Sequence, residues 1–426
     1  MALYLKDSTF IDWRSLEFRH VHIRVEEGEN GPVQFLQKLP KEIEKTDHVL
    51  DCSGRIVTKS FVNAHHHVYS ALARGMPSPP RPPQNFYEIL KYIWWRLDKA
   101  LDLEMIEASA LVTAMACAKN GVTFVIDHHA SPNAIEGSLS AIARAFDRVG
   151  VSHLLCYEMS DRDGAEAKEK ALAETENYLA SGNPALVGLH ASFTVGDDLL
   201  TGAVALAEQY NSGIHVHVAE DPIDEVWCLR DHNKRVLERF AGSGVLDFAK
   251  TILAHGLHLD EKEREIFRKS KAHIAQNTES NLNNNVGVFS SQGLGERIVL
   301  GTDGMHSDML RSAKMAFLVG QHEGVGADEI YRRFRWVHGY LAGNGFAGDG
   351  ENNLVVLNYD SPTEMNSDNF LGHFIYGIES RHVESVISAG KLIYHRGEML
   401  TVNEKEILHF AREMSLKLWE KLRSEK

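Results

Sequence analysis

Short, nearly continuous apolar runs recur through the middle of the chain, and a longer segment rich in helix-forming residues follows most of them. A parallel strand that is covered on both faces is apolar throughout, so these runs predict buried parallel strands. Eight strand-then-helix units predict an α/β fold, namely a (β/α)₈ TIM-like barrel over residues 56–345. The eight runs cover residues 56–65, 122–127, 152–158, 185–190, 213–218, 251–255, 272–276 and 297–303.

The two ends of the chain follow a different pattern. Residues 20–25 (HVHIRV) alternate, as a half-buried strand does, and short strands LVVLNY, FIYGI, VESVIS and KLIYH are expected after Asn344. We expect residues 1–55 and 346–402 to form one small composite β-sandwich domain. Residues 403–426 carry apolar side chains at helical spacing and predict a C-terminal surface helix.

Composition narrows the class of protein. The formal net charge is -14, which argues against a nucleic-acid partner because no excess of Lys and Arg is available to neutralise phosphates. The four cysteines form no CxxC pair, and we find neither a signal peptide nor an apolar stretch long enough to cross a membrane. We therefore expect a cytoplasmic protein, with a homo-oligomer, most simply a dimer, as the default assembly.

Histidine and aspartate residues fall where predicted strands end. His65 and His67 close the first run, His217 closes the fifth and Asp303 closes the eighth. Residues two apart on a strand point to the same side, so His65 and His67 can share one ion while His66 points away. The carboxyl ends of barrel strands meet at one rim, so these side chains predict one divalent metal. Three His and one Asp suit Zn²⁺ with an open position for water, with Fe²⁺ as the alternative.

Each of these signals has a structural alternative. The His run can be a polar strand end, His215 and His217 can be a buried pair, and Asp303 can cap a helix. The metal interpretation is favoured because separate strand ends deliver all four ligands to the same rim.

Two further residues are candidates for proton transfer. Glu220 follows His217 by three residues, on a loop from which a general acid or base can reach a metal-activated water. His255 ends the sixth run, before Gly256, although a single His is often structural. We take Glu220, His255 and Asp303 as the catalytic candidates.

Other polar and aromatic residues near strand ends are candidates for contact with a substrate, or for hydrogen bonds that orient a metal ligand. Trp94 and Trp95 can stack on a flat substrate, but neighbouring helical positions face different ways, so at least one is expected in the core. Glu158 is a weaker candidate. The candidate substrate-binding residues are His128, His129, His190, Trp94, Gln276 and Asn281.

Several motifs resemble the amidohydrolase superfamily. They are FVNAHHHVYSALARG, HVAE (217–220), LAHGLHL (253–259), NTESNLNNNVG (277–287) and LGTDGMHSD (300–308). The branch that they resemble contains guanine deaminase, methylthioadenosine/S-adenosylhomocysteine deaminase and the chlorotriazine hydrolases. DHHASP (127–132), CYEMSDRDG (156–164) and GLHASFT (188–194) are similar to the SsnA-type aminohydrolases.

The resemblance implies a role for each matching residue. His65, His67, His217 and Asp303 would hold the metal, Glu220 would shuttle protons, and His255 would hold the hydrolytic water or the substrate. Binuclear relatives carry a bridging Lys after the fourth strand, and residues 185–193 (ALVGLHASF) contain none, which favours one metal.

The expected activity is hydrolytic deamination of a purine- or pyrimidine-like heterocyclic amine by a metal-activated water. A hydrolase of a cyclic amide, an imine or a C–Cl bond is the alternative, since the same attack serves these bonds. A non-catalytic barrel scaffold is a remote second alternative. The cytidine-type zinc deaminases are excluded because the chain has no PCxxC motif.

Overall fold

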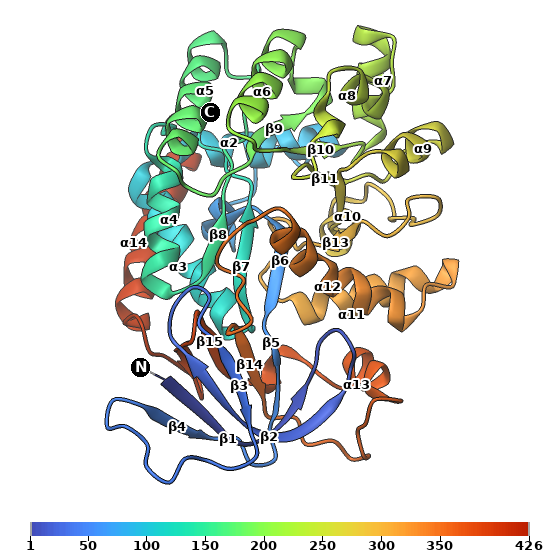
Figure 1. Cartoon of the computed structure of the whole chain (residues 1–426). Coiled ribbons are helices and arrows are strands. Elements are labelled where there is room, and N and C mark those ends of the chain that lie inside the picture. The colour runs from blue at the N-terminus through green and yellow to red at the C-terminus, as the bar shows by residue number, and fades with distance from the viewer. Residues whose placement is uncertain (1, 425–426) are drawn as a thin grey trace.

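The computed structural model describes residues 2–424 and divides into a β-sheet layer at one end and parallel strands surrounded by helices at the other (Figure 1). The sheet layer uses both ends of the chain, as expected. Its strand order is β17 (Glu398–Met399), β16 (Lys391–His395), β15 (Val383–Ser388), β14 (Leu354–Leu357), β5 (Ile56–Lys59), β1 (Ala2–Ile11), β2 (Phe18–Glu26) and β3 (Val33–Leu36), with β4 (His48–Asp51) also paired to β1.

Hydrogen bonds join these strands into one continuous nine-stranded sheet, and the composite β-sandwich stays a prediction. The sheet is continuous at β1, which pairs with β4 through Leu3–Lys6 and with β5 through Thr9 and Phe10. A register shift between Leu5 and Ser8 bends β1 between these two pairings and keeps the ladder continuous.

The parallel strands form two sheets that contact each other at both junctions. Bridges Leu155–Ala185 and Met159–Leu189 join the third and fourth units, and His66–Asp303 joins the first and eighth. Side chains from six of the strands share one interior cluster with α12 (Ala327–Gly343). The two sheets are β6 (Phe61–His66), β7 (Val122–Asp127) and β8 (Ser152–Leu154), and β9 (Val187–Ala191), β10 (Ile214–Val218), β11 (Ile252–His255), β12 (His273–Gln276) and β13 (Ile298–Leu300).

Helices cover the outside of these strands (Figure 1). Along the first half of the barrel region, before β10, these helices are η1 (Val68–Ala73), α1 (Phe86–Ile89), η2 (Leu90–Trp94), α2 (Trp95–Ala100), α3 (Leu103–Lys119), α4 (Ser138–Val149), α5 (Ala165–Ala180) and α6 (Asp197–Gln209). Along the second half of the barrel region these are α7 (Pro222–His232), α8 (Val236–Gly242), α9 (Glu261–Lys269), α10 (Thr278–Asn284) and α11 (Met309–Gly320). Two later helices pack on other helices: α13 (Phe370–Tyr376) on α11 and α12, beside the sheet layer, and α14 (Glu404–Ser424) on α3. Within residues 2–424, no helix is long and apolar enough to cross a membrane.

Two predicted strands differ from the structure. The first apolar run divides, because Ile56–Lys59 pairs with β1 and β14 and only Phe61–His66 joins the parallel strands. The strand expected at FIYGI is wrong, since this sequence lies mostly in α13. Phe370 and Phe374 are four residues apart and both pack on Tyr331, so their spacing is that of a helix.

A buried ionic cluster connects the sheet layer to the helical layer. Lys59, at the end of β5, lies 2.9 Å from Asp349 through Nζ and Oδ1. The other carboxylate oxygen of Asp349 is 2.7 Å from Nδ1 of His338, which belongs to α12. All three side chains are at most 5% exposed, so the cluster lies in the interior between the layers.

Candidate metal centre and active site

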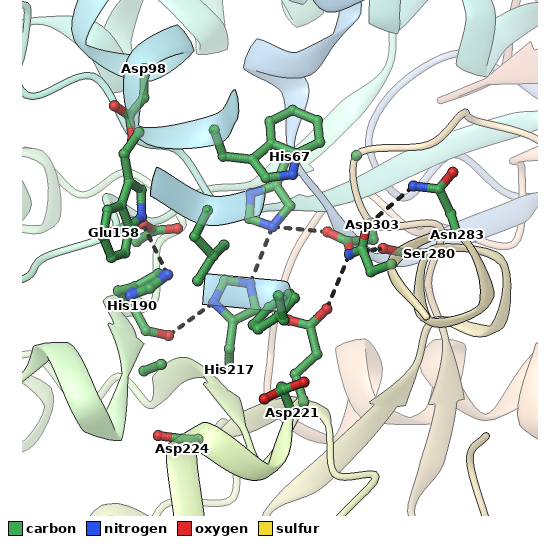
Figure 2. Close-up of a pocket in the computed structure, with 18 of the residues that line it drawn as sticks. His67, Asp98, Glu158, His190, His217, Asp221, Asp224, Ser280, Asn283 and Asp303 are labelled. Atoms are coloured by element: carbon green, nitrogen blue, oxygen red, sulfur yellow. Dashed lines mark hydrogen bonds and ion pairs between the residues drawn. The ribbon is translucent and has the colours of Figure 1, made fainter. Parts of the chain in front are cut away.

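The ends of three parallel strands, β6, β10 and β13, bring the predicted metal ligands together, and Figure 2 shows His67, His217 and Asp303. His67 Nε2 lies 3.2 Å from His217 Nε2 and 3.0 Å from Asp303 Oδ1. His65 Nε2 lies 3.6 Å from the same Asp303 oxygen. All four side chains are buried, and they come from segments of the chain more than 80 residues apart.

These distances fit a divalent cation. Ligand atoms at about 2.0–2.1 Å around a tetrahedral ion are separated by roughly 3.3 Å, in the range of the three distances. His65 Nε2 is also buried without a hydrogen-bond partner within the described residues. Buried polar atoms are normally paired, so an unpaired imidazole nitrogen facing a carboxylate is what a metal ligand requires.

Backbone conformation aims the site residues. Ala219, His255 and Asp303 have φ values of 45°, 76° and 53°, a left-handed region that non-glycine residues rarely occupy and that often marks functional sites. Gly301 lets β13 pass close to β6, because a Cβ there would lie 2.4 Å from Asn277 Oδ1 and 2.8 Å from His65 Cβ. The close approach allows the Asp303 N–H to donate to His65 O at 3.0 Å.

The far nitrogen of each candidate ligand is also fixed. His67 Nδ1 donates to the His128 carbonyl at 2.7 Å, and His217 Nδ1 donates to the His190 carbonyl at 2.9 Å. Each bond leaves the Nε2 lone pair for a metal. His65 Nδ1 lies 2.9 Å from Nε2 of His215, so a side-chain imidazole fills the same role there.

Electrostatics distinguish the two carboxyl groups of the site. Burial opposes ionisation of Asp303, but its contacts with His65 and His67 hold its pKa well below the ordinary value. Burial raises the pKa of Glu220 well above its ordinary value, and the charge of Asp303 adds to this effect. The two directions are opposite: the surroundings favour the ionised form of Asp303 and the protonated form of Glu220, which is the form that a general acid requires.

His255 contacts both carboxyl groups. Its Nε2 lies 3.4 Å from Glu220 Oε2 and 3.9 Å from Asp303 Oδ2. Burial lowers the pKa of His255 to about 4, so the ring is neutral at pH 7. Asn281 Nδ2 donates to His255 Nδ1 at 2.7 Å, which leaves the ring hydrogen on Nε2, facing the pocket.

The structure separates the predicted substrate-binding residues into two groups. Trp94 and His190 line the pocket. Trp95 lines it as well, although at least one of the two tryptophans was expected in the core. Both tryptophans reach the pocket because η2 is a π-helical turn, which widens the helix immediately before α2. The residues that do not line it are His128, His129, Gln276 and Asn281.

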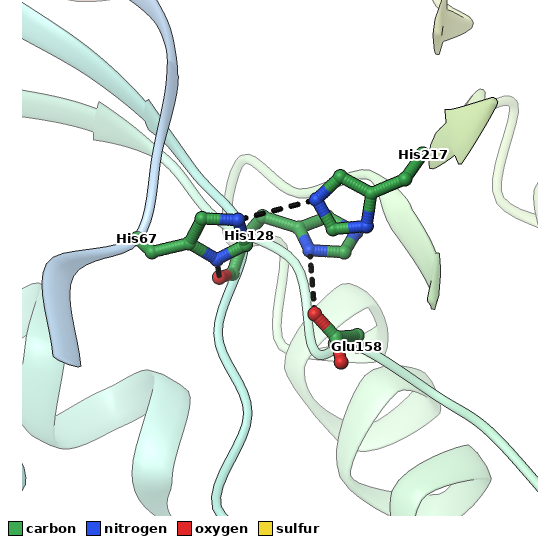
Figure 3. Close-up of side chains that lie close together, drawn as sticks. All are labelled: His67, His128, Glu158 and His217. Atoms are coloured by element: carbon green, nitrogen blue, oxygen red, sulfur yellow. Dashed lines mark hydrogen bonds and ion pairs between the residues drawn. The ribbon is translucent and has the colours of Figure 1, made fainter. Parts of the chain in front are cut away.

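These four residues contact other side chains. His129 Nε2 bonds to Ser131 Oγ at 2.9 Å, and Gln276 accepts from Arg333 at 2.8 Å. Asn281 orients His255, as described above, and His128 pairs with Glu158 (Figure 3).

Sequence reasoning missed two residues that hold the site in place. Ser280 donates to Asp303 Oδ2 at 2.5 Å, and Asp224 accepts the backbone N–H of Ala219, beside Glu220, at 2.9 Å. For Ser280, the only indication in the sequence was its place in the Asn-rich segment 277–287. Polar side chains that pack against the end of a strand need hydrogen-bond partners there. Asp224 looked like an ordinary first-turn carboxylate of a helix.

Comparison with known proteins agrees with this geometry. The model of the amidohydrolase family matches residues 56–332. The chain is 28% identical to a 5′-deoxyadenosine deaminase of Methanocaldococcus jannaschii, covering 91% of this chain and 94% of the relative. It is 27% identical to a 5-methylthioadenosine/S-adenosylhomocysteine deaminase of Thermococcus sibiricus, covering 92% and 94%.

Solved structures share the fold at lower identity. A zinc-bound adenosine deaminase from Xanthomonas campestris superposes with a TM-score of 0.82 at 16% identity, over 98% of both chains. Because the family model spans well over half of the sequence, and the strand-end histidines and aspartate converge as that fold requires, the chain belongs to the amidohydrolase family.

Proposed function

We propose that this protein is a metal-dependent aminohydrolase that releases ammonia from a purine- or pyrimidine-like heterocyclic amine. The observation that carries the proposal is geometric: His67, His217 and Asp303 converge at one end of the parallel strands, and Glu220 lines the same pocket. Relatives along nearly the whole chain are named as deaminases of adenosine-like compounds, which supports the same chemistry.

We propose a single divalent metal held by His65, His67, His217 and Asp303. Zn²⁺ is the preferred ion, since three imidazoles and a carboxylate match its chemistry, and Fe²⁺ is the alternative. When bound, such a metal lowers the pKa of a coordinated water toward neutrality and so supplies the nucleophile.

The protein's own groups move the protons. Asp303 Oδ2, fixed by the Ser280 hydroxyl, accepts the proton of the attacking water. His255 Nε2–H orients that water, because the hydrogen bond from Asn281 to Nδ1 keeps the ring hydrogen on Nε2. Glu220 donates its proton to the ring nitrogen next to the attacked carbon. It then takes the remaining proton of the added water from the hydroxyl group on that carbon and passes it to the departing amine, and the proton held by Asp303 returns to Glu220 after ammonia leaves.

The closure of the barrel and the bounds of the two domains belong to the same proposal. We propose that β6 to β13 act as one closed (β/α)₈ barrel within residues 56–345, because bridges link both junctions of the two parallel sheets. The segments 2–55 and 346–402, with β5, would form the accompanying sheet domain, and residues 404–424 form α14; residues 1, 425 and 426 of the predicted segments lie outside the described residues. A homodimer stays a prediction that light scattering can check.

Ammonia release is the direct test. Protein reconstituted with Zn²⁺ is incubated with a panel of aminated purines, pyrimidines and pterins, and ammonia is measured by a coupled assay. We expect release from at least one compound, abolished by a chelator. Chloride release from chlorinated rings, or ring opening of cyclic amides, with no ammonia from any amine would replace deamination by those alternatives.

A further inference from the structure

The pocket has two chemically different sides. In Figure 2, Glu158, His190 and Asp98 lie on one side of His67 and His217, and Asp303 lies on the other. The reacting groups occupy the Asp303 side, since Glu220 and His255 contact each other there. The Glu158 side has no part in the proton transfers, so it is available to hold the remainder of the substrate.

Glu158 is a buried carboxylate at this second side. Its side chain is 4% exposed and lines the pocket. Oε2 lies 3.2 Å from His128 Nδ1, whereas Oε1 lies 4.0 Å from His190 Nε2, beyond hydrogen-bond distance. Burial disfavours the ionised form, but His190, His128 and Arg162 hold the pKa of Glu158 well below its ordinary value. Oε1 is therefore a charged acceptor without a hydrogen-bond donor among the described residues.

His128 keeps this carboxylate in place (Figure 3). Its Nε2 lies 3.1 Å from the carbonyl oxygens of both Leu189 and His215, so this nitrogen carries a hydrogen and donates to them. The ring is fully buried and cannot turn without breaking those bonds. Nδ1 thus lies on the side of Glu158, 3.2 Å from Oε2, and Oε1 is left to the pocket.

The charge of the pocket lining is one-sided. Among residues 2–424, no Lys or Arg lines it. The guanidinium of Arg162 packs over the Trp95 ring and is bonded to Asp98 and to Asp163 (2.8 Å). A phosphate or carboxylate bound at the Glu158 side would therefore meet the charge of Glu158 with no Lys or Arg side chain in the lining to pair with it. The lining carboxyl groups are Asp98, Glu158, Glu220, Asp221, Asp224 and Asp303.

Aromatic rings form the walls between the two sides. They suit a flat ring whose faces are apolar and whose edges carry polar groups. Trp94 and Trp95 come from consecutive positions on either side of the boundary between η2 and α2. The lining aromatic side chains other than histidine are Tyr69, Phe86, Trp94, Trp95 and Phe193.

We propose that Glu158 is a substrate-binding residue that selects a neutral or cationic amino-heterocycle carrying N–H or O–H donors on the side away from the attacked carbon. The corollary is that substrates with a phosphate or carboxylate are rejected. This inference rests on the proposed deaminase function and adds to it the polarity of the substrate.

The first experiment compares Glu158→Gln with Glu136→Gln, which makes the same charge change at an exposed site. The substrate is whichever aminated purine, pyrimidine or pterin releases ammonia in the panel. We expect Glu158→Gln to raise KM about 10- to 100-fold, as loss of a charged hydrogen bond does, with a smaller change in kcat. Zinc content, measured by elemental analysis, stays at the native value in both variants.

The second experiment uses the native enzyme, so it does not depend on the folding of a variant. Adenosine is compared with adenosine 5′-monophosphate, and guanine with 9-methylguanine, which lacks the N9–H donor. We expect the charged or methylated compound of each pair to have a kcat/KM at least about tenfold lower than its parent. A preference for the nucleotide, or for the methylated ring, overturns the inference.

The deaminase function and the substrate-binding role of Glu158 can be tested separately. If no amine releases ammonia, the proposed function fails. If ammonia is released but Glu158→Gln leaves KM within the range of Glu136→Gln, only the substrate-binding role of Glu158 is lost.

Discussion

At the scale of single residues, position on a strand was enough to predict which side chains lie close together. His65, His67, His217, His255 and Asp303 follow apolar runs, and the ends of parallel strands meet at one edge. The loops beyond the strands have no such periodicity, so the sequence did not show that His129 faces Ser131 or that Glu158, rather than His128, faces the pocket.

Glu220→Gln tests the proton donor. The amide keeps the shape of the carboxyl group but cannot supply a proton, so turnover is expected to fall by about 10²–10⁴. Because Glu220 is not a proposed ligand, bound zinc stays unchanged. Ammonia release and elemental analysis on the same preparation measure both quantities, and a variant with native turnover would remove Glu220 from the mechanism.

His215→Phe tests the orientation of a ligand. His215 Nε2 accepts from His65 Nδ1, and its own Nδ1 lies 3.7 Å from Cys156 Sγ. These contacts fix the orientation of the His65 ring, so that Nε2 faces the proposed metal position. Loss of such a partner typically weakens metal binding 10- to 100-fold. Competition with a chromogenic chelator gives the affinity.

The matched control is His409→Phe, at a histidine whose side chain is 75% exposed on α14. Equal zinc affinity in the two variants would mean that His215 does not orient His65.

At the scale of elements, a predicted strand or helix agreed with the structure where its apolar pattern was long enough to show a clear period. Continuous runs gave the parallel strands, and residues 404–424 gave a helix with a buried stripe. FIYGI failed because five residues are too few to tell a period of 2 from one of 3.6. The division of the first run at Ser60 was also invisible, since both β5 and β6 are buried along their whole length.

Leu418→Ala and Leu416→Ala form a matched pair on α14. Leu418 is 0% exposed and lies on the side of α14 that packs on α3, whereas Leu416 is 63% exposed. We expect Leu418→Ala to lower the free energy of unfolding by about 2–5 kcal/mol, and Leu416→Ala to change it by less than about 0.5 kcal/mol. Urea denaturation measures both, and equal losses would contradict the packing of α14.

At the scale of the whole molecule, buried charges join the two layers. Burial opposes ionisation of Asp349, but His338 and Lys59 hold its pKa at about 2. Nothing in the sequence pattern predicted this cluster, because its members lie in three separate segments and each looks like a surface residue.

Asp349→Asn tests that junction. Removing one member of a buried pair leaves Lys59 uncompensated, so a loss of about 3–5 kcal/mol in the free energy of unfolding is expected at neutral pH. The folded-state pKa of Asp349, about 2, lies below the ordinary 3.8, so its contribution is complete above pH 3.8 and disappears as the pH falls through 2. Urea titrations at several pH values should therefore show the difference from the native protein shrinking on acidification, and a constant difference would contradict the assignment.

The pairing of β5 with both β1 and β14 has a consequence for biosynthesis. While a ribosome makes the intervening 294 residues, from Ser60 to Asn353, β5 has β1 on one edge and nothing on the other. An unpaired edge invites pairing with other chains. Newly made protein therefore passes through a period in which this edge is open to aggregation, and chaperones would be needed most before residue 354 emerges.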